Sequence, residues 1–230
     1  MISIIIPIFN EEENIKKLVP YLQKCCKGFN AEIIICDGGS TDNSVKIAKS
    51  LNTKVVLSTR KGRAVQMNAA AAIAIFDTYY FVHADSIPPA SFCSDILTAV
   101  NSGYELGRYR TRFESNKLLL KLNAYFTRFD WFMCYGGDQT LYITRSLFSK
   151  INGYDEQLLI MEEYDLVNRG RQFARYKIFS KATIVSVRKY VNNSWLKVQR
   201  ANYRTVQLFK KGMPQADLLA QYKKALEDIK

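Results

Sequence analysis

Two short runs of β-branched apolar residues, each ending abruptly in polar residues, constrain the fold more than any other feature. The first run, ISIIIPIF, precedes Asn10 and Glu11, and the second, EIIIC, precedes Asp37 and the rest of the segment DGGSTD. A strand that is apolar on both faces belongs inside a parallel sheet. Ligands of open α/β sheets bind at the carboxyl ends of the strands, so the two runs predict a nucleotide pocket at a shared edge. The alternative, in which DGGSTD is only a strand-to-helix turn, stays open at this point.

The first hundred residues alternate between strand and helix patterns. Strands are predicted at 3–8, 32–36, 54–58 and 78–82, and helices at 41–51 and 63–76. An earlier helix follows Asn10, which has the capping-box spacing to Glu13, and Pro20 predicts a kink or an early break in that helix. Such alternation with short loops is typical of a mainly parallel sheet with right-handed crossovers.

Beyond residue 86 the alternation is less regular. The patterns predict helices at 88–101, 117–133, 161–173, 195–211 and 216–228, a helical turn at 146–150, and strands at 104–113, 141–144 and 182–187. The sequence contains no internal repeat and no low-complexity tract. We predict one domain over residues 1–190 and a helical C-terminal extension over residues 191–230, packed on or near that domain.

Cysteine and histidine usage argues against a disulfide framework and against structural zinc. The five cysteines are odd in number and include no CxxC pair, as is typical of reduced cytosolic thiols. His83 is the only histidine, so the usual zinc clusters are missing. No basic leader with a cleavage site opens the chain and no apolar run approaches about 18 residues, so we expect neither a signal peptide nor a membrane span. These features predict a cytoplasmic protein.

The net charge of +12 indicates an anionic partner. Nucleic acid, an anionic membrane or a substrate that carries phosphates would each fit such a charge. Basic residues are enriched after Arg188, but no RNP-like aromatic strand or zinc finger accompanies them. Nucleic acid is therefore the weaker explanation, and we expect no nucleic-acid partner.

Three further segments carry residues suited to chemistry on a phosphorylated ligand. Asp85 follows the fourth predicted strand, where one carboxylate can hold Mg²⁺ or Mn²⁺ together with substrate phosphates, and the nearby His83 fits a packing role or a ligand role. The segment RKGRAVQMN places three cations and a glycine before a helix, which suits either bound phosphate or a solvated basic turn. The segment MEEYD puts Glu162 and Glu163 at a helix start, where a carboxylate can act as a base or only favour the helix dipole.

Taken together, the segments PIFNEE, DGGSTD, HAD and MEE resemble the pattern of glycosyltransferase family 2 on a GT-A fold. The segments GRAVQMN, GGDQ at 136–139 and RKY at 188–190 narrow the likeness to the small bacterial group of radical-SAM/selenodomain-associated glycosyltransferases, which the chain resembles. The resemblance implies an α/β fold of GT-A type, a Rossmann-like, mainly parallel sheet flanked by helices, with a helical C-terminal extension. It covers nearly the whole chain and is weakest after about residue 194.

The resemblance also implies roles for individual residues. Glu163 would be the catalytic base, with Glu162 as the alternative, and Asp85 would bind the metal and the diphosphate. The implied donor-binding residues are Pro7, Asn10 and Glu11 at the base and ribose end, Asp37 at the nucleobase, Arg60, Gly62, Arg63 and Gln66 along the nucleotide and diphosphate, His83 near the ribose, and Arg188 as a late phosphate contact. Two positions depart from the family pattern, since His83 replaces the first Asp of the DxD motif and Glu163 replaces the more usual Asp.

The activity that the resemblance implies is an inverting transfer of a sugar from a nucleotide-diphosphate sugar to a hydroxyl acceptor. A divalent cation, Mn²⁺ or Mg²⁺, would assist the departure of the diphosphate. An alternative from another class is a catalytically weak nucleotide-sugar-binding protein or a peripheral membrane-surface protein. Asp85 and the acidic pair that contains Glu162 favour the enzyme.

The segment LLLKLNAYFTRFDWFM, residues 118–133, carries more large apolar residues than one buried stripe requires. Together with the basic tail, it predicts that the protein touches a membrane at its cytoplasmic face without crossing it, which would suit a lipid-linked acceptor. In the alternative interpretation the segment packs beneath the sheet and the basic tail is a solvated face. Both interpretations stay open at the level of the sequence.

Overall fold

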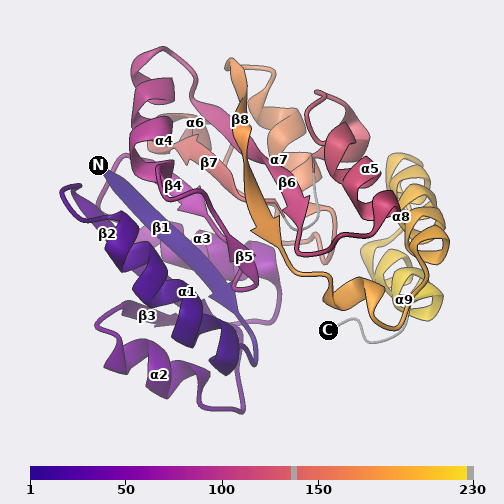
Figure 1. Ribbon diagram of the computed structural model, residues 1–230, viewed down its shortest axis with the longest axis horizontal. Helices are drawn as coiled ribbons and strands as arrows, with labels where there is room; N and C mark the ends of the chain where they lie inside the picture. The colour runs from indigo at the N-terminus through magenta and orange to yellow at the C-terminus, as the bar shows by residue number, and fades with distance from the viewer. Residues whose placement is uncertain (136–138, 227–230) are drawn as a thin grey trace.

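The computed structural model describes residues 1–135 and 139–226, and a single sheet lies at its centre (Figure 1). Over those residues the sheet has eight strands in the order β3-β2-β1-β4-β7-β6-β8-β5. The strands are β1 (Ile2–Ile8), β2 (Ala31–Asp37), β3 (Lys54–Leu57), β4 (Thr78–Phe81), β5 (Ser86–Ile87), β6 (Leu106–Phe113), β7 (Leu141–Thr144) and β8 (Tyr176–Val185). The helices are α1 (Glu12–Cys25), α2 (Ser44–Ser50), α3 (Arg63–Ile73), α4 (Phe92–Asn101), α5 (Leu118–Phe126), α6 (Arg145–Lys150), α7 (Glu162–Gly170), α8 (Trp195–Lys210) and α9 (Gln215–Ala225), with 3-10 turns η1 (Phe132–Cys134) and η2 (Arg188–Tyr190).

The strands β3, β2, β1 and β4 form the predicted parallel half of the sheet. β1 pairs in parallel with both β2 and β4, and β2 pairs in parallel with β3. Every residue of β1 is buried, as expected of a strand that helices cover on both faces. The register places Ile8 opposite Asp37, so β1 and β2 end side by side at the edge where the sequence predicts a ligand pocket.

Beyond β4 the sheet is mixed. β7 is antiparallel to both β4 and β6, β8 runs parallel to β6, and the short β5 is antiparallel to β8. β6 passes β8 closely at Gly107, where a Cβ atom would lie only 2.5 Å from the Lys177 carbonyl oxygen. A side chain there would force the two strands apart, so glycine is required.

Hydrophobic cores lie on both faces of the sheet. Ile4 and Ile6 of β1 belong to one core and Ile5 belongs to the other, as the alternation of side chains along a strand dictates. Residues of α1, α2 and α4 complete the first core, and residues of α3, α6 and α7 complete the second. The helices therefore cover both faces, which confirms the predicted α/β class with flanking helices.

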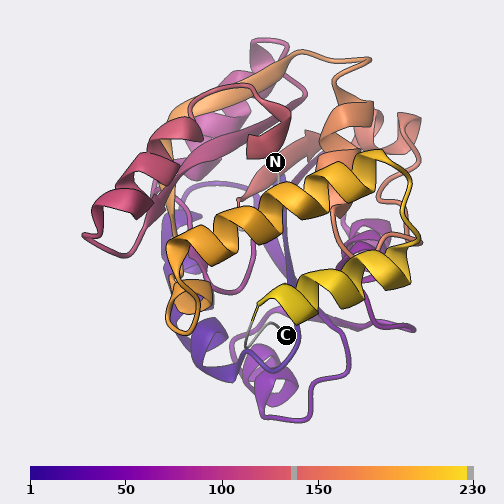
Figure 2. The same ribbon diagram turned by 90° about the vertical axis from the view of Figure 1, so that its right-hand side faces the viewer.

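The C-terminal helices α8 and α9 lie side by side along one flank of the sheet (Figure 2). Val206 of α8 and Leu218 of α9 are buried against Met161, the residue that precedes α7. The extension is thus joined to the rest of the fold through the start of α7. Of the helices in the described residues, none is both long and apolar enough to cross a membrane.

The beginning of α1 differs from the sequence-based prediction. Asn10 does not cap this helix, because it adopts a left-handed backbone conformation with φ of 54° and its side-chain oxygen accepts from Thr41 of the neighbouring loop. Glu11 takes the capping position without a side-chain cap bond, and the helix continues past Pro20 to Cys25. Of the kink or early break predicted at Pro20, the early break was therefore wrong.

The predicted helix over 117–133 was also wrong in length, since α5 ends at Phe126. Arg108, which is fully buried on β6, donates to the carbonyl oxygens of Thr127 (2.7 Å) and Phe129 (3.1 Å). Because these oxygens accept hydrogen bonds from Arg108, they do not accept the backbone bonds that would extend the helix. The predicted strand at 182–187 likewise starts earlier, at Tyr176, because β6 supplies hydrogen-bonding partners along that whole segment.

Candidate active site

The loops that follow β1 and β2 are interlocked at the predicted pocket edge. The backbone N–H of Asn10 donates to Ser40 Oγ at 2.8 Å, and the N–H of Thr41 donates to Asn10 Oδ1 at 2.8 Å. The N–H of Glu11 donates to Ser44 Oγ at 2.9 Å. The structure therefore brings Asn10 and Glu11 together with the segment DGGSTD, as the sequence predicted.

Asp37 is buried at the end of β2, where its carboxylate closes the turn that follows. Its Oδ2 accepts hydrogen bonds from the backbone N–H groups of Gly39 at 2.9 Å and Ser40 at 3.0 Å. Gly39 adopts a φ of +93°, which favours glycine because it has no Cβ. An ionised carboxylate has about four acceptor sites, so these bonds leave acceptor capacity for a ligand. The implied contact between Asp37 and a nucleobase stays a prediction.

Gln66 of α3 joins the ends of β1 and β2. Its Nε2 donates to the Ile8 carbonyl oxygen at 2.8 Å and to the Cys36 carbonyl oxygen at 2.7 Å, and the side chain is buried. Gly38 passes directly over this amide, since a Cβ there would lie 3.0 Å from Gln66 Nε2. The donor group of Gln66 thus belongs to the fold, while its place along the nucleotide stays a prediction.

The basic segment before α3 faces acidic partners. Arg60 forms an exposed ion pair with Glu156, and Arg63 Nε lies 3.3 Å from Glu162 Oε1. Gly62, between them, has a φ of +135°. That conformation allows the chain to turn sharply into α3. The structure therefore brings Arg63, but not Arg60, into contact with the predicted catalytic pair.

The acidic pair opens α7 from an unusual backbone position. Met161, immediately before the helix, has a left-handed φ of 73°, which is uncommon for a residue with a side chain. Glu162 and Glu163 are nevertheless buried, with 2 % and 6 % of their surfaces exposed. The helix N-terminus favours negative charge, which offsets part of the cost of burial.

Each of the two glutamates has its own basic neighbour. Burial raises the pKa of Glu162, although the charge of Arg63 opposes the rise. Glu163 Oε1 lies 2.7 Å from His83 Nε2. Burial acts to lower the pKa of His83, but the charge of Glu163 and its hydrogen bond outweigh burial and raise that pKa. His83 therefore contacts the predicted base, and its implied place near the ribose stays a prediction.

Asp85 and Glu11 meet at one arginine. Arg188 Nη2 donates to Asp85 Oδ2 at 3.0 Å and lies 3.3 Å from Glu11 Oε1. Burial acts to lower the pKa of Arg188, but the two carboxylates outweigh it and raise that pKa. Residues that are 103 and 177 positions apart in the sequence thus share one cluster, which the sequence predicted only through the resemblance.

Asp85, the predicted metal ligand, lies just after β4, and its carboxylate contacts Arg188. Within residues 1–135 and 139–226, no group of three or more His, Cys, Asp or Glu side chains could hold a metal ion. His83, two positions earlier, is bonded to Glu163 instead. Mg²⁺ is commonly held by one or two carboxylates together with substrate phosphates. Asp85 therefore fits a cation shared with a diphosphate.

Tyr154, beside the acidic pair, was missed by the sequence analysis as part of the site. Tyr154 is fully buried, and its pKa is raised well above its usual value, first by burial and then by the charges of Glu163 and Glu162. Asn68 holds Tyr154 by accepting from its N–H at 2.9 Å and donating to its carbonyl oxygen at 2.9 Å. The polar Asn68 on an apolar helix face was the available signal for this contact.

The remaining predicted residues lie as follows. Pro7 is buried in β1 opposite Cys36, just beyond the last residue pair of β1 with β4, Ile5 and Phe81. Of the segment GGDQ, residues 136–138 lie outside the described residues. Their expected part in the site is therefore left as a prediction.

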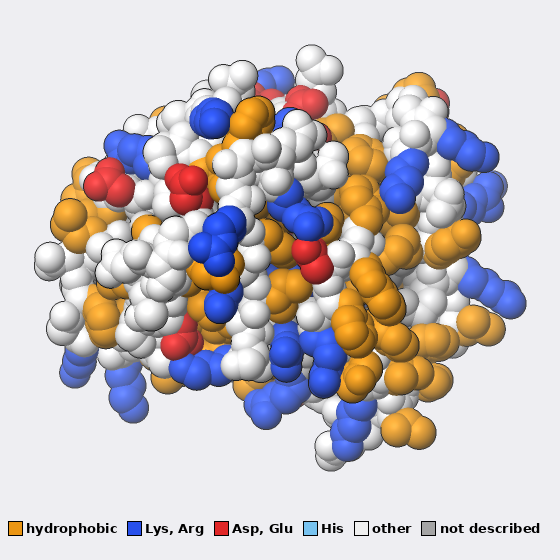
Figure 3. Space-filling view, turned by 90° about the horizontal axis from the view of Figure 1, so that it is seen from above, with side chains coloured by type: hydrophobic (Ala, Val, Ile, Leu, Met, Phe, Trp, Pro, Cys, Tyr) orange, Lys and Arg blue, Asp and Glu red, His pale blue; other side chains and the backbone are white. Residues whose placement is uncertain are grey.

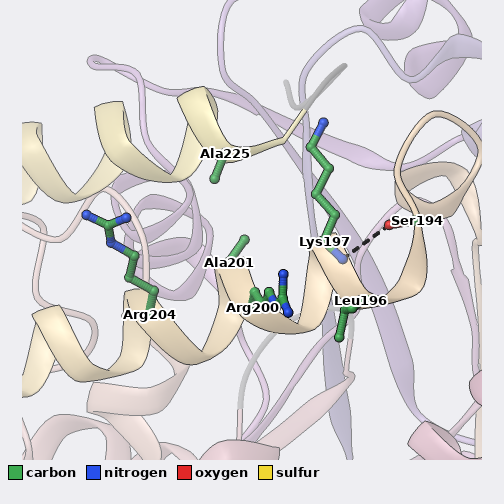
Figure 4. Close-up of a pocket in the computed structure, with 7 residues that line it drawn as sticks. All are labelled: Ser194, Leu196, Lys197, Arg200, Ala201, Arg204 and Ala225. Atoms are coloured by element: carbon green, nitrogen blue, oxygen red, sulfur yellow. Dashed lines mark hydrogen bonds between the residues drawn. The ribbon is translucent and has the colours of Figure 1, made fainter.

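A basic groove of about 310 Å³ lies between α8 and α9 (Figure 4). Its lining consists of Ser194, Leu196, Lys197, Arg200, Ala201, Arg204 and Ala225. None of these residues is a predicted site residue. The groove is therefore separate from the cluster at the strand ends.

A family model matches most of the chain, including the strand ends described above. The model of the family "Glycosyl transferase family 2" matches residues 3–154, which span both interlocked loops and the Asp85 segment. The match ends before α7, so it does not include the acidic pair. The likeness to the radical-SAM/selenodomain-associated group stays a prediction.

Curated relatives match over parts of the chain. A dolichol-phosphate mannosyltransferase of Pyrococcus furiosus is 26% identical over 110 residues, 46% of this chain and 31% of the relative. An undecaprenyl-phosphate 4-deoxy-4-formamido-L-arabinose transferase of Proteus mirabilis is 28% identical over 120 residues, 48% of this chain and 37% of the relative. The aligned parts thus span only about a third of these two relatives.

Solved structures share the fold. The mannosyltransferase PcManGT from Pyrobaculum calidifontis, in complex with GDP-Man and Mn²⁺, has a TM-score of 0.70 at 15% identity, over 92% of this chain and 64% of that chain. Residues 1–349 of S. aureus TarS, in complex with UDP-GlcNAc, have a TM-score of 0.65 at 18% identity, over 81% of this chain and 58% of that chain. These likenesses confirm the predicted GT-A type fold class.

Proposed function

The chain belongs to glycosyl transferase family 2, and from that premise we propose that it transfers a sugar from a nucleotide-diphosphate sugar to a hydroxyl acceptor with inversion. The observation that carries the proposal is the buried Glu163, which is held 2.7 Å from His83 beside the strand ends. A buried, oriented carboxylate suits a general base that must be within reach of a proton.

In the proposed reaction, Glu163 takes the proton from the acceptor hydroxyl as its oxygen attacks the anomeric carbon. The new bond forms on the face opposite the diphosphate, the bond from that carbon to the diphosphate oxygen breaks, and the configuration inverts. His83 orients the carboxylate, and Glu162 with Arg63 is the alternative base. Proximity and orientation supply much of the rate in such a site.

The departing diphosphate requires positive charge. We propose that Arg188 and Arg63 provide it from the protein, and that Asp85 holds Mn²⁺ or Mg²⁺ jointly with the diphosphate. A divalent cation there supplies Lewis-acid stabilisation of the leaving group. The complexes of PcManGT with Mn²⁺ and of TarS with UDP-GlcNAc support this donor chemistry by analogy of fold.

The proposal extends to the acceptor and to the location of the protein. The dolichol-phosphate and undecaprenyl-phosphate named in two relatives support a lipid-linked acceptor and a peripheral contact with a membrane. The five cysteines are free thiols, which supports a cytoplasmic location. We also propose that residues 191–230 form an extension of a domain over residues 1–190.

A donor screen coupled to variants tests the function. UDP-, GDP- and TDP-sugars, with and without Mn²⁺, are tested for a rise in thermal stability, since a ligand at 100 times its Kd adds roughly 2.7 kcal/mol. Glu163→Gln is expected to keep donor binding and to lower transfer by about 10² to 10⁴. Asp85→Ala is expected to abolish the Mn²⁺ dependence of donor binding.

Glu162→Gln is the matched control for the base. If Glu162→Gln is the inactive variant and Glu163→Gln is active, the roles of the two glutamates are exchanged. Donor binding without transfer to any hydroxyl acceptor would instead favour a nucleotide-sugar-binding protein.

A further inference from the structure

Helix α5 presents an apolar face that the rest of the described chain does not cover. Of its nine residues, Leu120 alone is buried. The side chains exposed on and just after this helix are Leu118 (79%), Leu119 (46%), Leu122 (46%), Tyr125 (47%), Phe126 (38%) and Trp131 (53%). We call these six residues the α5 face. Figure 3 shows hydrophobic side chains gathered on the side of the molecule where α5 lies.

The charged side chains on α5 and at its two ends are basic, and the acidic Asp130 beside Trp131 is paired with Arg171. Lys117, Lys121 and Arg128 are exposed on or beside α5, and the sequence has no acidic residue between Glu114 and Asp130. Arg128 also stacks on the ring of Tyr125, with its guanidinium carbon 3.7 Å from the ring centroid. An apolar surface with aromatic side chains and a basic border is typical of helices that lie in a membrane interface.

We propose that the α5 face docks the protein on an anionic lipid bilayer, with the apolar side chains at the acyl boundary and the basic side chains at the headgroups. Charge complementarity favours this occupant over a second copy of the chain. A two-fold pairing of α5 faces would bring Lys117, Lys121 and Arg128 of each copy close to the same cations of the other, which costs free energy.

The position of α5 links the surface to the strand ends. Asn123 of α5 donates to Tyr190 Oη at 3.4 Å, and Gln199 of α8 donates to the same oxygen at 3.4 Å. Tyr190 belongs to η2, the short turn whose first residue, Arg188, contacts Asp85. These bonds connect α5, through η2, to the cluster that contains Asp85. The docking itself requires no transfer activity.

Flotation with vesicles tests the docking. The full chain is mixed at low salt with vesicles of phosphatidylcholine alone or with vesicles rich in phosphatidylglycerol. We expect it to float with the second kind only, and to be released as salt screens the charges. A protein that stays in solution with the anionic vesicles at low salt overturns the proposal.

Paired variants locate the contact. Lys117→Gln with Lys121→Gln is expected to lower the vesicle partition coefficient about 30-fold, since each basic residue near an anionic leaflet contributes roughly fivefold. The matched control, Lys46→Gln with Lys49→Gln on α2, removes the same charge from exposed positions of another helix and should change partition by less than about threefold. Equal losses in the two pairs would mean that net charge alone binds, and would overturn the assignment to α5.

The apolar contribution has its own control. Leu118→Gln with Leu122→Gln is expected to lower partition at least tenfold, since each leucine loses its burial in lipid. Ile73→Gln with Ile75→Gln, which replaces residues that are 44% and 62% exposed at the end of α3, should leave it unchanged. Thermal unfolding curves like that of the wild type establish that all four paired variants are folded.

Sedimentation velocity without vesicles tests whether a second copy of the chain covers the α5 face instead. A monomer is expected for the wild type. A dimer that becomes a monomer on Leu118→Gln with Leu122→Gln would show that the α5 face joins two copies, and would overturn the membrane proposal.

Discussion

Replacing Gln66 by methionine removes one hydrogen-bond donor while keeping a side chain of similar length and volume. In the structure this donor bridges the carbonyl oxygens of Ile8 and Cys36, at 2.8 and 2.7 Å, and so joins the ends of β1 and β2. The sequence resemblance placed the same side chain along the nucleotide. The variant therefore separates a role in the fold from a role in ligand binding.

The expected cost follows from the two bonds. The Ile8 carbonyl oxygen keeps its bond from the Gly38 N–H at 2.9 Å, whereas the Cys36 carbonyl oxygen loses its side-chain donor. At about 1 kcal/mol for each lost bond, the free energy of unfolding should fall by roughly 2 kcal/mol. For a chain of this size, 1 kcal/mol shifts Tm by about 2–4 °C, so Tm should fall by about 6 °C.

Thermal and urea unfolding, followed by circular dichroism without any nucleotide, measure the effect. Gln172→Met, at an exposed position after α7, is the matched control and should keep the wild-type Tm. A Gln66→Met protein with wild-type stability and impaired donor binding would refute the reasoning, because the amide would then act on the ligand.

Three further outcomes are expected. Gly38→Ala places a Cβ 3.0 Å from Gln66 Nε2 and should lower the free energy of unfolding by about 1–2 kcal/mol. In a double-mutant cycle followed by urea unfolding, the same substitution should cost less in the Gln66→Ala protein, because the side chain that it crowds is shorter. Burial acts to raise the pKa of Glu32, but hydrogen bonds from Lys54 and other donors outweigh burial and lower that pKa below 4.5. The charged carboxylate therefore stabilises the fold above pH 4.5, and this contribution is lost as the pH falls through the lowered pKa. Glu32→Gln should therefore make the free energy of unfolding depend less on pH in the acid range. An unchanged pH dependence would contradict this prediction. Ser194→Ala removes the oxygen that accepts from the Lys197 N–H at 3.3 Å and should lower the free energy of unfolding in urea by about 1 kcal/mol; an unchanged free energy would contradict the cap.

The sequence predicted the parallel half of the sheet because the signals for it are local. β1 and β2 are short β-branched runs that end in polar residues, so each strand and its end could be read from neighbouring positions. The acidic start of α7 is local in the same way. These segments carry most of the candidate site, which is why Asp37, Asp85 and the pair Glu162 and Glu163 could be named before the fold was known.

Contacts between segments that are distant in the sequence could not be predicted from such local signals. Gln66 reaches carbonyl oxygens 30 and 58 positions away, and Arg108 ends α5 through carbonyl oxygens 19 and 21 positions away. A buried arginine within a strand gives no local sign that it will stop the helix after it. The exposure of the α5 face has the same cause, since the apolar composition of residues 118–133 fits a covered helix and an uncovered one equally well.

Both departures from the family pattern meet in a single contact. An aspartate at position 83 would stand beside the buried carboxylate of Glu163, and two carboxylates in one site raise the cost of charging either of them. Histidine at that position instead places its ring Nε2 2.7 Å from Glu163 Oε1, where it holds the carboxylate by a hydrogen bond. Both substituted residues therefore take part in this one contact. In this chain, then, position 83 acts on the carboxylate at the start of α7, and Asp85 and Arg188 are left as the pair that faces the diphosphate in the proposed reaction.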